Sequence, residues 1–175
     1  KDVIVVVWSL AVLELLHFLE RHGEVGIAGI VLVDSSVGEG PPIPPATAFR
    51  EALASNRRMA IEQFVRGMFL QSPSEREIDE LVRSASKMNL EDSLALFPTH
   101  IPREYWRQIT RGIKAPLMYM VTRQFGAQAR SLADVRLNTH VVICENSGHA
   151  IFADDSRRFN RELENFIRHL PSRVA

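Results

Sequence analysis

Four short runs of apolar residues are the feature that most limits how this chain can fold. They span residues 3–7, 27–33, 117–121 and 141–144, and nearly every position in them is apolar. Runs of this length without polar alternation are typical of strands that are buried on both faces, as in a parallel sheet covered by helices. We therefore expect a parallel sheet of about four strands.

The segments between these runs show helical periodicity. In the first of them the apolar residues recur at helical spacing: Val12, Leu15, Leu16 and Leu19. Gly23 then stands where a helix is expected to end. Strands that alternate with helices predict an α/β fold, because parallel neighbours need a crossover connection and a helix supplies it.

The middle of the chain shows no strand pattern. A loop rich in glycine and proline is followed by about seventy residues with helical spacing only. We therefore predict that residues 41–113 form a helical cap or lid. This cap would be inserted into a core made of residues 1–40 and 114–175.

Composition excludes several classes of function. The chain has 175 residues, of which 46% are hydrophobic, and its 21 Lys and Arg balance its 21 Asp and Glu. This fits one domain, and it offers no basic surface for nucleic acid. A single cysteine, Cys144, cannot form an internal disulfide, so we expect a cytoplasmic location. Ser9 and Glu14 interrupt the first apolar stretch, which is too short for a membrane span.

Ser9 lies between the first predicted strand and the first predicted helix. There its hydroxyl would stand above the carboxyl end of the sheet, and the amide of Leu10 could donate to an oxyanion. The usual nucleophile elbow is Gly-x-Ser-x-Gly, whereas this chain has Val7 and Ala11 at the glycine positions. A β-branched residue is expected to crowd the turn, so Val7→Gly is expected to raise activity. The alternative is that Ser9 is only a helix cap.

His149 follows the last predicted strand, in a loop that begins at Glu145. Loops at the carboxyl ends of parallel strands are where ligands and reacting groups gather in α/β sheets. A histidine in a loop can also be a simple filling residue. Because Ser9 and His149 are expected at the same edge of the sheet, each strengthens the interpretation of the other.

These segments resemble the α/β-hydrolases of the esterase, lipase and cofactor-free haloperoxidase-like branch. The resemblance rests on residues 3–39 and on Ser-Gly-His-Ala-Ile-Phe-Ala-Asp-Asp at residues 147–155. It implies that Ser9 attacks an acyl carbon and that His149 takes its proton, without metal or other cofactor. In that family further strands precede the elbow, so we expect an upstream segment or a second chain to cover the first strand.

The acid that orients the histidine needs a separate argument. Most relatives carry it just after the strand equivalent to the third one here, but residues 122–126 contain no carboxylate. Asp34 ends the second strand at the same edge, so we predict that it lies within hydrogen-bond reach of a ring nitrogen of His149. Asp34 as a loop cap is the alternative. Asp154 and Asp155 are expected to cap the last helix instead.

Several large side chains are candidates for contact with a substrate: Trp8, Phe64, Met68, Tyr105 and Trp106. Each of them can equally be ordinary core, because apolar residues at helical spacing usually are. The remaining histidines show no metal-ligand spacing, and no glycine-rich phosphate loop follows a strand.

The sequence therefore predicts a serine hydrolase that cleaves a small apolar carboxylic ester through an acyl-enzyme. The main alternative is a catalytically degenerate relative that uses the fold for ligand binding or assembly. A related lyase or haloperoxidase-like activity on the same scaffold is a third possibility, since fold alone does not fix the reaction.

Overall fold

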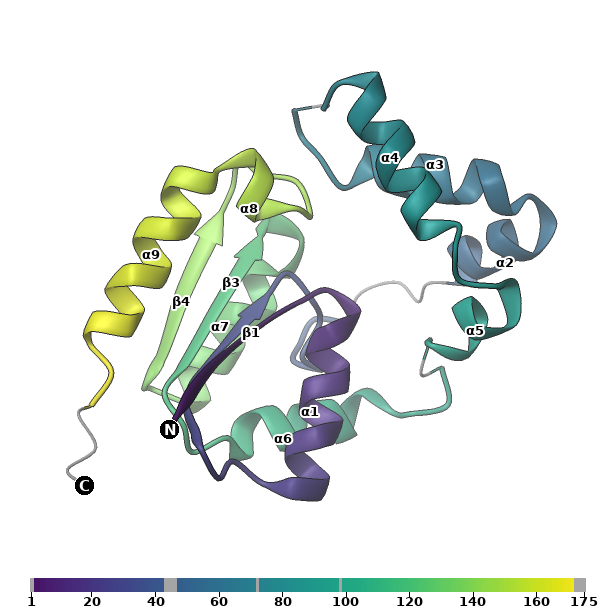
Figure 1. Cartoon of the computed structure of the whole chain (residues 1–175). Coiled ribbons are helices and arrows are strands. Elements are labelled where there is room, and N and C mark those ends of the chain that lie inside the picture. The colour runs from purple at the N-terminus through teal and green to yellow at the C-terminus, as the bar shows by residue number, and fades with distance from the viewer. Residues whose placement is uncertain (1, 43–46, 72, 98, 172–175) are drawn as a thin grey trace.

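A parallel four-stranded sheet forms the centre of the molecule (Figure 1). The structure is a computed structural model that describes residues 2–42, 47–71, 73–97 and 99–171. The strands, in their spatial order, are β1 (Val3–Trp8), β2 (Ile27–Val33), β3 (Leu117–Thr122) and β4 (Thr139–Cys144). All neighbouring pairs are parallel. The predicted α/β fold with about four parallel strands is confirmed.

Helices cover both faces of this sheet. One face packs against α1 (Leu10–His22), α6 (Arg103–Gly112) and α7 (Gly126–Val135), which follows the short helix η1 (Arg123–Phe125). The other face packs against α8 (Ile151–Asp154) and α9 (Ser156–Arg168). Within the described ranges, no helix is long and apolar enough to cross a membrane.

Four further helices gather beyond the carboxyl ends of the strands (Figure 1). They are α2 (Thr47–Ser55), α3 (Arg57–Gly67), α4 (Glu75–Ala85) and α5 (Leu90–Ala95). Asn56 separates α2 from α3, where its side chain accepts a hydrogen bond from the amide of Met59 at 3.3 Å. Asparagine is a preferred N-cap, because its oxygen pairs with an amide that the helix leaves free. Residues 43–46 of the preceding proline-rich loop lie outside the described residues.

Helix α6 behaves differently from α2–α5, although the predicted cap includes it. Its Trp106 and Ile109 belong to the same apolar cluster as α1 and the sheet, whereas α2–α5 contribute to a separate cluster. The division into a core and a cap over residues 41–113 remains a prediction.

The two middle strands are the best-buried part of the molecule. Every residue of β3 is buried, and only Ala28 of β2 is partly exposed. Cys144 at the end of β4 is also inaccessible, and burial raises the pKa of its thiol. The carboxyl ends of these strands are therefore firmly held.

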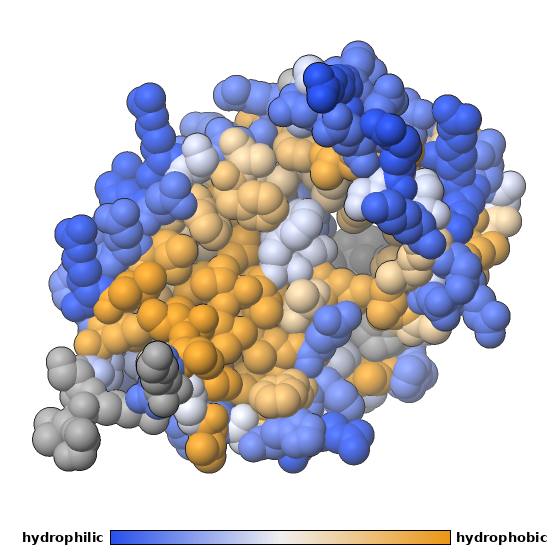
Figure 2. Space-filling model, in the orientation of Figure 1, coloured by the Kyte–Doolittle hydropathy of each residue, from blue (hydrophilic) through white to orange (hydrophobic). Residues whose placement is uncertain are grey.

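Strand β1 is less buried than its composition predicts. It ends the sheet, and Val3 and Val6 are 53% and 44% exposed. Figure 2 shows an apolar patch on the face of the molecule where β1 lies. The expectation that this run is buried on both faces is therefore wrong for the described residues. Whether another segment or chain covers the strand remains a prediction.

The expected crowding by Val7 is also not seen. Val7 lies within β1 and is paired in register with Leu32, a conformation that suits β-branched residues. Among the described non-glycine residues, only Ser9 and Asp34 have a positive φ. The unusual backbone angles thus fall on the serine itself, and this reason for expecting Val7→Gly to raise activity falls away.

Candidate active site

Ser9 forms the turn between β1 and α1. Its φ of 58° and ψ of −128° lie outside the regions that most residues prefer. Its amide donates to the carbonyl of Val33 at 3.0 Å, which continues the pairing of β1 with β2. Such strain persists only where the surrounding structure enforces it, and a sharp strand-to-helix turn of this kind raises a serine hydroxyl above the sheet.

The amide of Leu10 is the first of helix α1. The first four N–H groups of a helix have no acceptor within the helix, and the positive end of the helix dipole lies there. The amide next to Ser9 is therefore placed to donate to an anionic oxygen.

His149 lies beside Ser9 in the loop that follows β4. Its Nε2 is 2.8 Å from Oγ of Ser9. The indole of Trp8 holds this loop, because its Nε1 donates to the carbonyl of His149 at 2.8 Å and the two rings lie 4.9 Å apart. Trp8 thus contacts the candidate base from the strand that leads to the serine.

Asp34 lies on the other side of the imidazole. Its Oδ2 is 2.8 Å from Nδ1 of His149, so the contact predicted from the sequence is present. Its Oδ1 accepts from the amide of Thr122 at 2.6 Å, and the residue is 1% exposed. A carboxylate only accepts, so the proton lies on Nδ1, and Nε2 is left free to accept from the hydroxyl of Ser9. The catalytic roles of the three residues remain a prediction.

An ion pair between buried Glu39 and the more exposed Arg111 supports the loop that carries Asp34. Glu39 is 1% exposed and accepts from Nε and Nη2 of Arg111 at 2.6 and 2.8 Å, and from the hydroxyl of Ser131 at 3.1 Å. Burial alone would raise the pKa of Glu39, but the hydrogen bonds and charge of Arg111 outweigh it, so the pKa is lowered. The loop is thereby tied to both α6 and α7.

Tyr119 of β3 also stabilises the loop after Asp34. This residue of β3 is fully buried, and its hydroxyl donates to the carbonyl of Ser35 at 2.5 Å. Burial, together with the negative charges of Asp34 and Glu39, raises the pKa of Tyr119 well above its ordinary value. The hydroxyl therefore stays protonated and remains a donor.

A cavity of about 310 Å³ opens beside the imidazole. It is lined by Phe64, Gly67, Met68, Gln124, Phe125 and His149. Two of the predicted substrate-contact residues, Phe64 and Met68, line this cavity, and their contact with a substrate remains a prediction. Gln124 and Phe125 were not predicted from the sequence, although their position directly after β3, at the carboxyl edge of the sheet, could have indicated them.

Tyr105 and Trp106 lie elsewhere. The hydroxyl of Tyr105 is 2.7 Å from Nδ1 of His17 on α1, and Trp106 is buried in the cluster between α6 and the sheet. Neither lines the cavity beside His149. Their expected contact with a substrate has no support in this arrangement.

The two aspartates after the histidine have different partners. Asp155 caps α9 as expected, because its side chain accepts from the amide of Arg158 at 3.2 Å. Asp154 does not cap this helix. Its carboxylate accepts from the amides of Leu70 and Gly148 at 2.8 and 2.7 Å, so the expected capping role is wrong for this residue.

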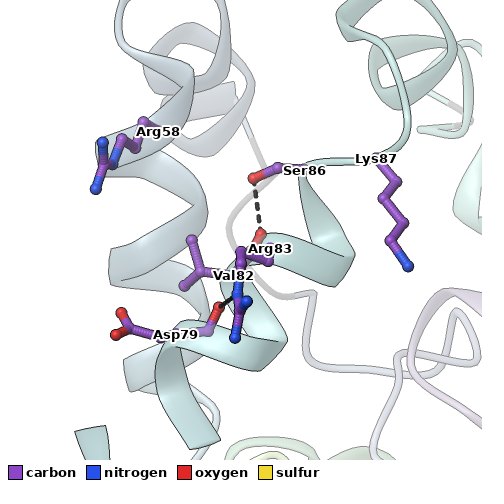
Figure 3. Close-up of a pocket in the computed structure, with 6 residues that line it drawn as sticks. All are labelled: Arg58, Asp79, Val82, Arg83, Ser86 and Lys87. Carbon is purple, nitrogen blue, oxygen red and sulfur yellow. Dashed lines mark hydrogen bonds between the residues drawn. The ribbon is translucent and has the colours of Figure 1, made fainter. Parts of the chain in front are cut away.

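A larger hollow of about 680 Å³ lies between α3 and α4 (Figure 3). Its lining side chains are mostly charged: Arg58, Asp79, Val82, Arg83, Ser86 and Lys87. Arg58 and Lys87 point away from each other in Figure 3. Arg83 and Ser86 donate to backbone carbonyls of α4. This wider hollow therefore lacks converging polar groups, and the smaller cavity beside His149 is the better candidate site.

Comparison with solved structures identifies the fold. A protein from Burkholderia cenocepacia assigned as an aryl esterase matches 99% of this chain, with 22% identity and a TM-score of 0.82. A bromoperoxidase from Bacillus anthracis matches 96% with 15% identity and a TM-score of 0.82. An esterase from Rhodococcus sp. ECU1013 matches 98% with 17% identity and a TM-score of 0.80.

The chain spans 66%, 68% and 66% of the lengths of these three proteins. The sequence itself matches no protein-family model. Comparison with curated protein sequences also gave no match. The four parallel strands and their helices thus form a partial α/β-hydrolase fold.

Proposed function

We propose that this chain is a serine hydrolase that cleaves a small apolar carboxylic ester through an acyl-enzyme. Ser9 is the nucleophile, His149 the general base and acid, and Asp34 the carboxylate that orients the imidazole. One observation carries the proposal: Oγ of Ser9, the imidazole and the carboxylate of Asp34 form a continuous hydrogen-bonded chain, with both contacts at 2.8 Å. The fold shared with esterases supports it.

Acylation begins when Oγ of Ser9 attacks the ester carbonyl carbon and its proton passes to Nε2 of His149. The imidazolium that forms lies against Asp34, whose negative charge stabilises it. The carbonyl oxygen becomes an oxyanion, to which the amide of Leu10 donates. When the ester bond breaks, Nε2 returns the proton to the departing alkoxide, which leaves as an alcohol.

Deacylation repeats these steps with water. His149 takes a proton from a water molecule, and the resulting nucleophile attacks the acyl carbon on Ser9. The acid product forms as Oγ departs, and Nε2 gives the proton back to Oγ. Each half of the reaction thus uses the three side chains together with the amide of Leu10.

The cavity beside His149 supports a small apolar substrate. Four of its lining residues, Phe64, Gly67, Met68 and Phe125, offer no charge, and its volume of about 310 Å³ is at the low end for small-molecule sites. Gln124 is the polar lining side chain besides His149. An ester with a short hydrocarbon group would bury that group here.

The exposed edge of β1 bears on the partner of the chain. Val3 and Val6 are exposed on β1, which forms one edge of the described sheet. An exposed apolar edge strand is prone to pair with another strand. We propose that an upstream segment or a second chain covers this edge in the working protein. Light scattering of the purified chain would test this, because a stable monomer with an uncovered β1 contradicts it.

Reaction with a fluorophosphonate probe tests the proposed nucleophile. The wild-type protein should label at Ser9, as located by peptide mass spectrometry, and should hydrolyse p-nitrophenyl acetate. Ser9→Ala should lose both, with turnover at least about 10⁴-fold lower, because the attacking oxygen is gone. Ser86→Ala is a matched control, since Ser86 is exposed at the end of α4, does not line the cavity beside His149, and donates its hydroxyl to the carbonyl of Val82.

Absence of labelling in a protein that circular dichroism shows to be folded would contradict the enzyme. It would favour the alternative of a degenerate relative that only binds ligands. Labelling that persists in Ser9→Ala would instead mean that another residue is the nucleophile.

A further inference from the structure

The carboxylate of Asp154 joins two segments that are distant in the sequence. Its Oδ2 accepts from the amides of Leu70 and Gly148 at 2.8 and 2.7 Å, and its Oδ1 accepts from the amide of Gln71 at 3.2 Å. Leu70 and Gln71 follow helix α3, whereas Gly148 directly precedes the candidate base. Hydrogen bonds to a charged acceptor are about twice as strong as neutral ones. One side chain thus connects the segment after α3 to the loop that carries His149.

The backbones of the two segments also meet directly. The amide of Ala150 donates to the carbonyl of Met68 at 2.8 Å. A Cβ at Gly148 would lie 2.7 Å from both Leu70 N and Met68 O, closer than real contacts allow. Glycine is therefore required at position 148 by this close approach. His149 stands between Gly148 and Ala150, the two residues that make these backbone contacts.

This junction lies at the wall of the candidate pocket. Phe64 of α3 and Met68 at the end of α3 line the cavity together with His149. A shift of the segment after α3 would therefore move the wall relative to the imidazole. Other groups hold the candidate catalytic residues: the indole of Trp8 binds His149, and the amide of Thr122 binds Asp34.

We propose that Asp154 is a positioning residue that fixes the pocket wall against the histidine loop and so determines the affinity for esters that fill the pocket. This inference rests on the proposed hydrolase function. Asp154 makes no described contact with Ser9, Asp34 or the imidazole ring, so it acts on binding and not on proton transfer.

Kinetics with two esters tests the proposal. Asp154→Asn removes the charge, and its side-chain NH₂ cannot accept from the backbone amides. For p-nitrophenyl hexanoate, whose chain would fill the pocket, KM should rise about tenfold, the effect of losing roughly 1.4 kcal/mol of hydrogen bonding. The kcat, its pH profile, and kcat/KM for p-nitrophenyl acetate should change less than about twofold.

Asp155→Asn is the matched control. This neighbouring carboxylate caps α9 through the amide of Arg158 and has no described contact with the segment after α3. It should leave the hexanoate KM unchanged. An equal loss for both esters, or a shifted pH profile of kcat, would mean that Asp154 acts through the base itself and would overturn the proposal. An unchanged KM would overturn it as well.

Gly148→Ala gives an independent second variant, because the added Cβ pushes the same two segments apart. It should show the same selective rise in the hexanoate KM. Hydrogen exchange of the Leu70 and Gln71 amides gives a readout that does not need turnover: exchange should become at least about tenfold faster in Asp154→Asn, and unchanged exchange would refute the junction. If the wild type hydrolyses neither ester, the proposed function fails, and exchange alone then decides on the junction.

Discussion

The sheet with its covering helices and the group α2–α5 are built very differently. Every residue of β3 is buried, whereas α5 has no buried residue, α2 and α4 have one each, and α3 has three of its eleven. A segment with little buried apolar surface opens locally at lower cost than a sheet core. The candidate reacting groups therefore lie on the firmer part of the molecule, and part of the pocket wall lies on the softer part.

The candidate pocket lies on the boundary between these regions. Phe64, Gly67 and Met68 come from the helical group, whereas Phe125 and His149 come from the edge of the sheet. Substitutions in the sheet region are therefore expected to change chemistry or stability. Those in the helical group are expected to change binding.

Among the variants that compare the two regions, the largest effect is expected from Asp34→Asn in the sheet region. The asparagine oxygen can still accept from the amide of Thr122, which turns its NH₂ group toward Nδ1 of His149. Nδ1 must then accept, and the proton moves to Nε2, which can no longer take one from Ser9. Turnover should fall about 10⁴-fold. Steady-state kinetics of p-nitrophenyl acetate hydrolysis measures this.

The thermal midpoint of Asp34→Asn should stay close to that of the wild type, because the hydrogen bonds between the paired strands are unchanged. Near-normal turnover in this variant would refute Asp34 as the orienting acid. It would also contradict the expectation that substitutions at the sheet edge change chemistry whereas those in α2–α5 change binding.

A smaller effect, on stability, is expected from Glu39→Gln. The variant breaks the paired contacts to Arg111 and should lower the free energy of unfolding by about 2 kcal/mol. Because the pKa of Glu39 is lowered on folding, its contribution is present above the ordinary value of about 4.3 and is lost as the pH falls through the folded value.

Urea unfolding at several pH values checks both parts. The wild type should lose stability relative to Glu39→Gln as the pH falls below about 4.3. A constant difference between the two proteins from neutral to acid pH would contradict the role of the Glu39 charge. Ser84→Ala, on exposed α4, serves as a control that should leave stability unchanged.

The smallest effect on stability is expected from Phe64→Ala in the helical group. Phe64 is 43% exposed, although its ring lies 4.9 Å from that of Phe49. Unfolding should become easier by only about 0.5 to 1 kcal/mol, while KM for p-nitrophenyl hexanoate rises several-fold and kcat stays constant. A large drop in kcat would show that the helical group takes part in chemistry, which would contradict its assignment to binding alone.

The sheet could be predicted because its information is local. Continuous apolar runs identified all four strands, and the missing carboxylate at residues 122–126 directed attention to Asp34. The contact between Asp34 and His149 then followed from topology, since parallel strands end at one edge.

The parts that could not be predicted depend on partners distant in the sequence. Nothing near Asp154 indicates that its carboxylate meets the amides of Leu70 and Gln71, 84 and 83 residues away. The exposure of β1 depends on which strands pair with it, not on its own apolar residues. The start of α3 is different, because an asparagine within a helical pattern is a local signal for an N-cap, and Asn56 caps this helix.

Cys144, buried at the end of β4, provides a natural probe for the opening of the sheet region. It is the single cysteine of the chain, it is inaccessible, and burial raises the pKa of its thiol. Only the thiolate reacts with alkylating reagents, so modification has to wait until the sheet opens. The apolar cluster around this thiol includes no described residue of α2–α5, so opening of those helices alone is expected to leave the thiol covered. The rate of alkylation therefore reports the lifetime of the sheet region by itself, without any introduced label.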